Sequence, residues 1–494
     1  MKVRAIAVFL GVVSVAGFAP FYLFPLPIIA LALLLRLAER SDRARAAFGI
    51  GFAYGLGFFL AGVSWIYVSL HDFGAMPAPI AVVVTLLFCA YLGLFPACAL
   101  LAATRIPTPI LRRCVAFPGA WVFAEWTRGW LFSGFPWLAL GYSQAPDSPL
   151  AGIAPMLGVY GVGLAASVSA GLLLHAFALG TSNIRWRPLA CLALVWGAAW
   201  ALKLISWSVP IGEPVRVSLL QGNVPQSMKW RPEMVASTLR RYQDMVLATH
   251  AQLVVLPETA LPMFLQDVPQ DFLLRIFVHA RNNRADVLLG VPERDAGQGY
   301  FNSVVSVGSS PSQYYRKSHL VPFGEFIPLR PLLGSVVQAL AIPLTDFARG
   351  KVTQRPLAVA GQAVAVNICY EDAFGEEIIR QLPEATLLVN VSNVAWFGDS
   401  IAPMQHLQIA QMRAIETGRY MLQATNTGMT AVIDPRGAVV NMAPTFQTAT
   451  VEASVLGYAG ATPYVLLGNA APIGLASVLT LFAFAAGCRE RWAI

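Results

Sequence analysis

Three side chains in the second half of the chain could together activate a nucleophile. Glu258 closes the apolar run LVVLPE, Lys317 lies in YYRKSHLVPFGEFIP, and Cys369 closes the apolar run AVAVNIC. A thiol with an ordinary pKa of about 8.5 is mostly protonated at neutral pH, so it needs a base and a nearby positive charge before it attacks a carbonyl. Each residue alone has an ordinary explanation, because a strand-end Glu is often a cap, most Lys are solvated and most free Cys are packing residues. Three such residues at loop ends favour a convergent site, with Glu258 as base, Lys317 as cation and Cys369 as nucleophile.

Cysteine usage singles out Cys369. It is the only Cys between residues 209 and 465, and the other five lie in or beside long apolar segments: Cys89, Cys98, Cys114, Cys191 and Cys488. In an oxidising compartment, a solitary thiol is either buried or reactive. A helical pattern follows Cys369 within a few residues, so we expect a strand-to-helix turn at which the helix N-terminus favours the thiolate.

No metal or cofactor site is predicted. The chain has no C-x-x-C or H-x-x-x-H pair, no GxGxxG and no P-loop. Such spacings are what zinc, dinucleotide and nucleotide sites require. We therefore interpret all six histidines as surface or packing residues: His71, His175, His250, His279, His319 and His406.

The composition is that of a membrane protein for about half of the chain. Of 494 residues, 56% are hydrophobic and only 12% are charged, whereas a soluble protein has about a quarter charged residues. A bilayer core takes about 20 apolar residues as a helix. Eight segments qualify as candidate spans: 3–19, 21–37, 47–69, 77–103, 114–127, 150–179, 188–208 and 466–487.

Basic residues predict the orientation of these spans. Thirteen Lys and Arg fall in the stretches that would share one side of the membrane: Lys2, Arg4, Arg36, Arg40, Arg43, Arg45, Arg105, Arg112, Arg113, Arg185, Arg187, Arg489 and Arg491. The opposite short loops hold essentially only Arg128, with Lys203 near the end of the seventh span. The positive-inside rule therefore predicts cytoplasmic termini and an extracytoplasmic 209–465 region. The first segment is not expected to be a cleaved signal peptide, because a second span follows almost at once.

This distribution also argues against nucleic acid as a partner. The net charge of +8 could indicate an anionic ligand, but the arginines of the first half lie in short loops between apolar runs. We find no stripe of basic and aromatic residues in the globular part, so the charge is attributed to membrane topology.

The predicted division of the chain has three parts. Residues 1–208 form a membrane domain of seven spans, 209–465 form the extracytoplasmic domain, and 466–494 form the eighth span with a cytoplasmic C-terminus. Within 125–149, Trp, Phe and Gly are frequent. Composition alone favours an interfacial aromatic belt there over a loop that shapes a lipid-facing cleft.

The sequence pattern of residues 209–465 predicts one α/β domain. Short β-branched runs predict strands at 215–223, 251–258, 286–293, 302–308, 363–371, 386–392, 421–426 and 429–434. Helical patterns cover 232–250, 269–284, 374–382 and 403–419. This alternation predicts sheets with helices packed on them.

The three reactive segments resemble a known superfamily. LPETA, RKSHLVPFGEFIP and NICYEDAFG are similar to the Glu, Lys and Cys signatures of the carbon–nitrogen hydrolases, or nitrilases. That resemblance implies an extracytoplasmic nitrilase-like α-β-β-α sandwich with a Glu base, a Lys and a Cys nucleophile. Because many soluble amidases share these signatures, they indicate a reaction class and not a substrate.

The remaining motifs resemble one membrane branch of that superfamily, the apolipoprotein N-acyltransferases. They include GFAPFYLFPLPIIAL, EWTRGWLFSGFPWLALGYSQ, VSLLQGNVPQSMKW and the stretch from NVSNVAWFGDS to AVIDPRG. The resemblance implies transfer of a fatty acyl chain from a phospholipid to the N-terminal amine of diacylglyceryl-cysteine. It also implies lipid-handling elements within 125–149, which supersedes the belt interpretation.

The resemblance assigns further roles. It implies Glu325 and Glu371 as supports of the triad, Tyr370 and Trp230 as substrate-adjacent residues, and no cofactor. It implies a monomer in the bacterial inner membrane, with the catalytic domain on the periplasmic side. One position departs from the family pattern, since Val394 stands where Asp is expected, which puts a local hydrogen-bond network in doubt.

Two other functions remain open at this point. A membrane-tethered nitrilase or amidase would use water as the acceptor, although a mere anchor would not need eight spans. A transporter or receptor would place charged residues inside its spans, and Glu125 is almost the only one.

Overall fold

The chain divides into two compact units. The computed structural model describes residues 1–40, 43–177, 185–295, 297, 299–327 and 347–492. One unit contains residues 1–67, 78–206 and 466–494, and the other contains residues 68–77 and 207–465. The short segment 68–77, which the sequence placed in a predicted span and the loop after it, therefore belongs to the unit that carries Glu258, Lys317 and Cys369.

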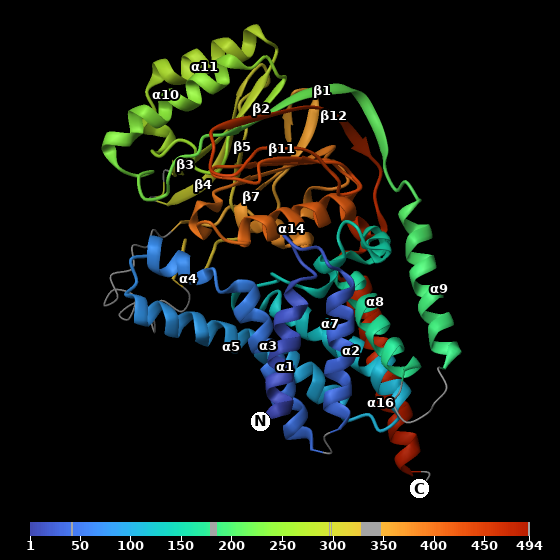
Figure 1. The fold of residues 1–494 in the computed structure, drawn as a ribbon. Helices are drawn as coiled ribbons and strands as arrows, with labels where there is room; N and C mark the ends of the chain where they lie inside the picture. The colour runs from blue at the N-terminus through green and yellow to red at the C-terminus, as the bar shows by residue number, and fades with distance from the viewer. Residues whose placement is uncertain (41–42, 178–184, 296, 298, 328–346, 493–494) are drawn as a thin grey trace. The chain divides into compact units, whose positions relative to one another are not determined.

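The first unit is helical. It is built from α1 (Lys2–Val15), α2 (Pro25–Glu39), α3 (Ala44–Val63), α5 (Ala78–Ala103), α7 (Phe117–Arg128), α8 (Ala154–Ala176), α9 (Trp186–Lys203) and α16 (Ala470–Trp492). Each predicted span overlaps one of these helices, with ends that differ by a few residues (Figure 1). Among the described residues, three helical stretches are both long and apolar enough to cross a bilayer: Ala44–Val63, Ala78–Ala103 and Pro149–Ala176. These apolar helices make the chain a membrane protein.

Glycines let the helices of this unit approach closely. A Cβ added at Gly55 of α3 would lie 2.7 Å from the Cα of Gly93 in α5. A Cβ at Gly57 would lie 2.3 Å from the main-chain oxygen of Val8 in α1. Both neighbours are backbone atoms that cannot move aside. Small residues therefore set the spacing of α1, α3 and α5, as is usual where helices pack within a membrane.

The aromatic segment 125–149 is a folded part of this unit. Beyond α7 it contains the short helical turns η3 (Leu131–Ser133) and η4 (Leu140–Gln144). Trp137 and Tyr142 are buried, whereas Trp130 and Phe132 are exposed. The buried Arg128 guanidinium donates to the main-chain oxygens of Phe135 and Trp137 at 2.5 and 2.6 Å. The belt interpretation is therefore wrong for Trp137 and Tyr142, because their side chains are buried inside this unit and do not lie on its surface.

The second unit contains two six-stranded sheets. The first has the order β12-β1-β2-β3-β4-β5 and the second has the order β11-β10-β9-β8-β7-β6. The strands of the first sheet are β1 (Val209–Gln221), β2 (Leu253–Val255), β3 (Asp286–Arg294), β4 (Tyr300–Gly308), β5 (Tyr314–Arg316) and β12 (Ala449–Ala459). Those of the second are β6 (Leu357–Val359), β7 (Gln362–Ile368), β8 (Leu387–Ser392), β9 (Met421–Thr425), β10 (Ala431–Ile433) and β11 (Val439–Met442).

The two sheets pack face to face and helices cover their outer faces. One buried cluster joins side chains of both sheets, including Val217, Leu288, Val366 and Leu422. A second cluster packs α10 (Pro232–Ala248) and α11 (Gln270–Asn282) on the first sheet, and a third packs α14 (Ala402–Thr417) on the second. These layers are visible in Figure 1, and they confirm the predicted α-β-β-α sandwich.

Most predicted elements of this unit are present, but several boundaries differ. The strand predicted over 251–258 is only the three-residue β2, and the one predicted over 363–371 ends at Ile368. The helix predicted over 374–382 is α13 (Gly375–Ile378) followed by η8 (Ile379–Gln381). The strands β5, β6, β11 and β12 were not predicted from the sequence.

The close helix contact in the first unit gives a stability prediction. Gly55→Val should lower the thermal midpoint of the detergent-solubilised protein, because the added side chain meets the Gly93 backbone. Overpacking of this kind costs about 1–3 kcal/mol. Gly197→Val is the matched control, since a Cβ at Gly197 of α9 meets nothing within 4 Å. Equal midpoints for the two variants would contradict the packing described here.

Candidate active site

Glu258 follows β2 and carries a carboxylate that is held from three sides. Its Oε1 accepts from Asn302 Nδ2 at 2.7 Å and from Lys317 Nζ at 3.4 Å. Its Oε2 accepts from the main-chain N–H of Asn393 at 2.9 Å. The residue is only 7% exposed. A buried carboxylate with three donors is fixed in orientation and remains ionised.

Lys317 follows β5 and joins two carboxylates. Its Nζ donates to Glu325 Oε1 at 2.9 Å and to Glu258 Oε1 at 3.4 Å. The Glu325 Oε1 atom also accepts from Asn302 Nδ2 at 3.1 Å, and its Oε2 accepts from the Val321 N–H at 2.9 Å. Lys317 is 1% exposed, so its charge is balanced inside the protein and not by water.

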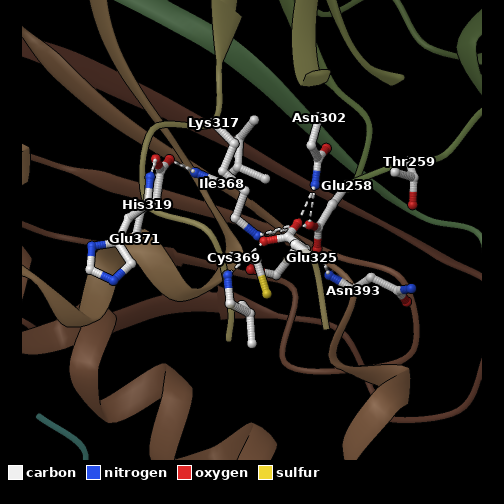
Figure 2. Close-up of polar contacts among 12 residues, drawn as sticks. Glu258, Thr259, Asn302, Lys317, His319, Glu325, Ile368, Cys369, Glu371 and Asn393 are labelled. Carbon is white, nitrogen blue, oxygen red and sulfur yellow. Dashed lines mark hydrogen bonds and ion pairs between the residues drawn. The ribbon is translucent and has the colours of Figure 1, made fainter. Parts of the chain in front are cut away.

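Cys369 lies where β7 ends and a 3₁₀ turn begins. It is the first residue of η7 (Cys369–Ala373) and has a φ of +54°, a left-handed conformation that is uncommon for a residue with a Cβ. Figure 2 shows its sulfur beside the point where Glu258, Lys317 and Glu325 meet. The helix that follows, α13, has four residues, so the strong helix N-terminal field predicted from the sequence is not available.

Glu371 fastens the Cys369 turn to the Lys317 segment. Its Oε1 accepts from the N–H and hydroxyl of Ser318 at 2.6 and 2.9 Å and from the His319 N–H at 3.0 Å. Its Oε2 accepts from the Ile368 N–H at 2.7 Å and the Tyr315 hydroxyl at 3.0 Å. Five donors on one buried carboxylate hold two loops from different sheets in register.

The charges around the site shape its protonation. Burial alone would raise the pKa of Glu258, but Lys317 and the Asn302 amide outweigh burial and lower that pKa. Burial likewise opposes the ammonium of Lys317, yet the carboxylates of Glu325 and Glu258 raise the pKa of Lys317. Burial, reinforced by Glu258, raises the pKa of the Cys369 thiol well above its ordinary value. The resting site therefore holds an ionised Glu258 next to a protonated thiol.

This arrangement can perform nucleophilic acyl chemistry. The ionised carboxylate can accept the thiol proton at the moment of attack, and the ammonium can stabilise the negative charge that develops. The three residues predicted as a triad are thus brought together by strand ends from both sheets.

Comparison with known proteins covers both units of the chain. Residues 10–172 match the family model of the apolipoprotein N-acyltransferase N-terminal domain, and residues 216–464 match that of the carbon–nitrogen hydrolases. A protein of Nitrosomonas europaea named apolipoprotein N-acyltransferase is 53% identical over 97% of this chain and 96% of its own. Proteins of the same name from Methylococcus capsulatus and Chromobacterium violaceum are 46% and 45% identical, over 98% and 97% of this chain and 96% and 93% of theirs. This chain belongs to the apolipoprotein N-acyltransferase family.

The resemblance to apolipoprotein N-acyltransferases implied four further site residues. Two of them lie inside the network and two are partly exposed. Glu325 and Glu371 lie inside the network. The half-exposed Tyr370 follows Cys369, and its ring lies edge-on to Phe374 with centroids 5.1 Å apart. Trp230 is 50% exposed. The roles of Tyr370 and Trp230 beside the substrate stay predictions.

Val394 leaves the neighbouring network intact. The residue is buried in the turn η9 (Val394–Phe397). Asn393, beside it, donates its Nδ2 to Gln226 Oε1 at 2.7 Å and accepts from Asn426 Nδ2 at 3.1 Å. The polar chain that orients Glu258 therefore runs through Asn393 and does not need the Asp expected at 394.

Several polar residues of this apolipoprotein N-acyltransferase site were not predicted from the sequence. Asn302, Asn393 and Lys229 all contact Glu258 or its main chain. Asn302 is the first residue of a predicted strand, and Asn393 and Lys229 lie in the family motifs. A polar residue beside an apolar run was therefore the sequence feature that could have indicated them. His406, predicted as a packing or surface residue, is buried, and its Nε2 lies 2.9 Å from Asp372 Oδ1 and 3.4 Å from the Cys369 main-chain oxygen.

The Asn302 contact gives a pH prediction. Asn302→Leu removes a donor from the Glu258 carboxylate, so the pKa of Glu258 should rise. Because the base works only when ionised, the acid limb of the pH–rate profile should move to higher pH, by about one unit. The profile is measured on acyl-enzyme formation.

Asn441→Leu is the control for that prediction, since Asn441 is exposed and its amide donates to the Glu452 main-chain oxygen. An acid limb that stays in place in Asn302→Leu would show that Glu258 is not the titrating base.

Proposed function

We propose that this protein transfers a fatty acyl chain from a phospholipid, through a thioester on Cys369, to the N-terminal amine of diacylglyceryl-cysteine in apolipoproteins. The observation that carries the proposal is the buried cluster of Glu258, Lys317 and Cys369 in a chain that also has apolar membrane helices. The names of relatives that match over nearly the whole chain support the same reaction.

The first half of the reaction forms the thioester. Glu258 accepts the proton of the Cys369 thiol while the sulfur attacks the ester carbonyl of the phospholipid. Lys317 stabilises the oxyanion of the tetrahedral intermediate. When the intermediate collapses, the ester C–O bond breaks and Glu258 returns the proton to the departing alkoxide. A lysophospholipid leaves, and the acyl group stays on sulfur.

The second half forms the amide. The neutral α-amine of the acceptor cysteine attacks the thioester carbonyl, and Glu258 accepts a proton from the amine nitrogen. The C–S bond then breaks, and the Cys369 sulfur regains a proton as the amide product leaves. No cofactor is needed, because the acyl donor is already an ester.

We propose further that the protein acts as a monomer in the bacterial inner membrane with residues 209–465 on the periplasmic side. The asymmetry of basic residues described above supports this orientation. A phospholipid donor and a lipoprotein acceptor are both membrane-anchored, which fits an enzyme with apolar spans.

A tethered hydrolase that uses water as the acceptor is not favoured. Such a hydrolase would be expected to match only the carbon–nitrogen hydrolase family, through its catalytic part. In this chain, residues 10–172 also match the N-terminal domain of apolipoprotein N-acyltransferases.

The nucleophile assignment is tested by mass. Incubation of the purified full-length protein with phospholipid should add the mass of one acyl chain, and hydroxylamine should remove it. Cys369→Ser should show no hydroxylamine-sensitive adduct and lose turnover by at least about 10³-fold, as expected when a covalent nucleophile is removed. Cys98→Ser, which replaces another free cysteine, is the control and should behave like the native protein. An adduct on Cys369→Ser would refute the assignment.

The orientation is tested by reporter fusions. A reporter active only in the periplasm should work when fused after residue 465 and fail when fused at the C-terminus, because the last span lies between the two points. The converse is expected of a cytoplasmic reporter. The same compartment for both fusions would contradict the topology.

A further inference from the structure

A second buried lysine lies beside the catalytic base. Lys229 precedes α10 and is 2% exposed. Its Nζ donates to the Thr259 hydroxyl at 2.6 Å and to the main-chain oxygen of Glu258 at 3.1 Å. Lys317 thus contacts the carboxylate of Glu258, whereas Lys229 contacts the backbone that carries it. Lys229 takes no part in either proposed half-reaction.

The residue that Lys229 contacts is strained. Thr259 has a φ of +46°, and a left-handed conformation is unfavourable for a β-branched residue. Such a conformation persists only where surrounding contacts enforce it. The bond from Lys229 to the Thr259 hydroxyl is one such contact, and the bond to the Glu258 carbonyl holds the preceding peptide. Both act on the turn from which the Glu258 side chain projects.

Lys229 also balances the charge of the site. Glu258 and Glu325 contribute two negative charges, and Lys317 contributes one positive charge beside them. A protonated Lys229 supplies a second positive charge. Burial lowers the pKa of Lys229 to about 8, against the opposing influence of the Glu258 carboxylate. Its ammonium remains the main form at neutral pH, and it favours the ionised form of Glu258.

We propose that Lys229 is a positioning residue of the acyl-transfer site, which holds the Glu258–Thr259 turn in its strained conformation and so aims the catalytic base at Cys369. Lys229 acts through Glu258 and does not touch the reacting atoms. The inference rests on the proposed role of Glu258 as the base that activates the thiol.

The first test uses a reaction that needs no lipid. Iodoacetamide alkylation of Cys369 in the full-length protein, followed by mass analysis of the Cys369 peptide across pH, reports how well Glu258 activates the thiol. Lys229→Met should slow Cys369 alkylation at neutral pH at least tenfold and move the acid limb of the profile to higher pH. Lys351→Met, which replaces an exposed lysine, should leave both unchanged, and circular dichroism should show that both variants fold.

The second test asks whether the backbone is the target of Lys229. Gly adopts positive φ without steric cost, so Thr259→Gly should restore part of the alkylation rate when added to Lys229→Met. We expect a recovery of at least threefold in the double variant. A residue that only stabilised the fold would show no such rescue.

The outcomes separate this inference from the proposed function. A native alkylation profile in Lys229→Met, or no recovery on adding Thr259→Gly, would overturn the positioning role. A shifted profile with rescue, combined with no acyl adduct on the native protein, would support the positioning role and refute phospholipid as the donor.

Discussion

Burial of ionised carboxylates beside a thiol is the constraint on which the rest of this site depends. Removing a charge from water costs several kcal/mol per ion unless a partner and hydrogen bonds compensate. Glu258 and Glu325 share the Lys317 ammonium and the Asn302 amide, so neither carboxylate lacks a donor. A buried carboxylate that stays ionised is able to accept a proton at neutral pH. The same arrangement disfavours a second anion, so the Cys369 thiol keeps its proton in the resting site.

The sandwich fold makes this constraint possible. Glu258 and Lys317 follow β2 and β5 of the first sheet, and Cys369 follows β7 of the second. The apolar cluster between the sheets fixes the separation of these strand ends, because interiors pack too tightly to tolerate shifts. Glu371 then joins the two sheets locally by accepting from residues on both the Lys317 and Cys369 segments. The positions of the Glu258, Lys317 and Cys369 side chains are thus set by packing and refined by a few buried polar contacts.

The sequence was sufficient to predict the architecture and to propose Glu258, Lys317 and Cys369 as one candidate site, and the reason is local. Glu258 and Cys369 each close an apolar run, and such runs predict strands, whereas Lys317 follows the unpredicted β5 and was indicated by its motif. The partners of Glu258 could not be found in this way, since Asn302 and Asn393 lie 44 and 135 residues away along the chain. The strand β12 was missed because most of its residues are not fully buried and its pairing with β1 spans more than 200 residues. The positive φ of Cys369 and Thr259 likewise comes from tertiary contacts and has no signature in residue type.

The central claim is that the acyl group on Cys369 is passed to an amine and not to water. Its most direct test isolates the full-length acyl-enzyme, formed from a phospholipid with a labelled fatty acid, and follows the label in a single turnover. With a synthetic diacylglyceryl-cysteine peptide present, the label should move to the peptide amine much faster than it appears as free fatty acid. An N-acetylated peptide, which lacks the free amine, should leave the acyl-enzyme intact. Release of the label as free fatty acid at the same rate with either peptide would contradict the account and identify a hydrolase.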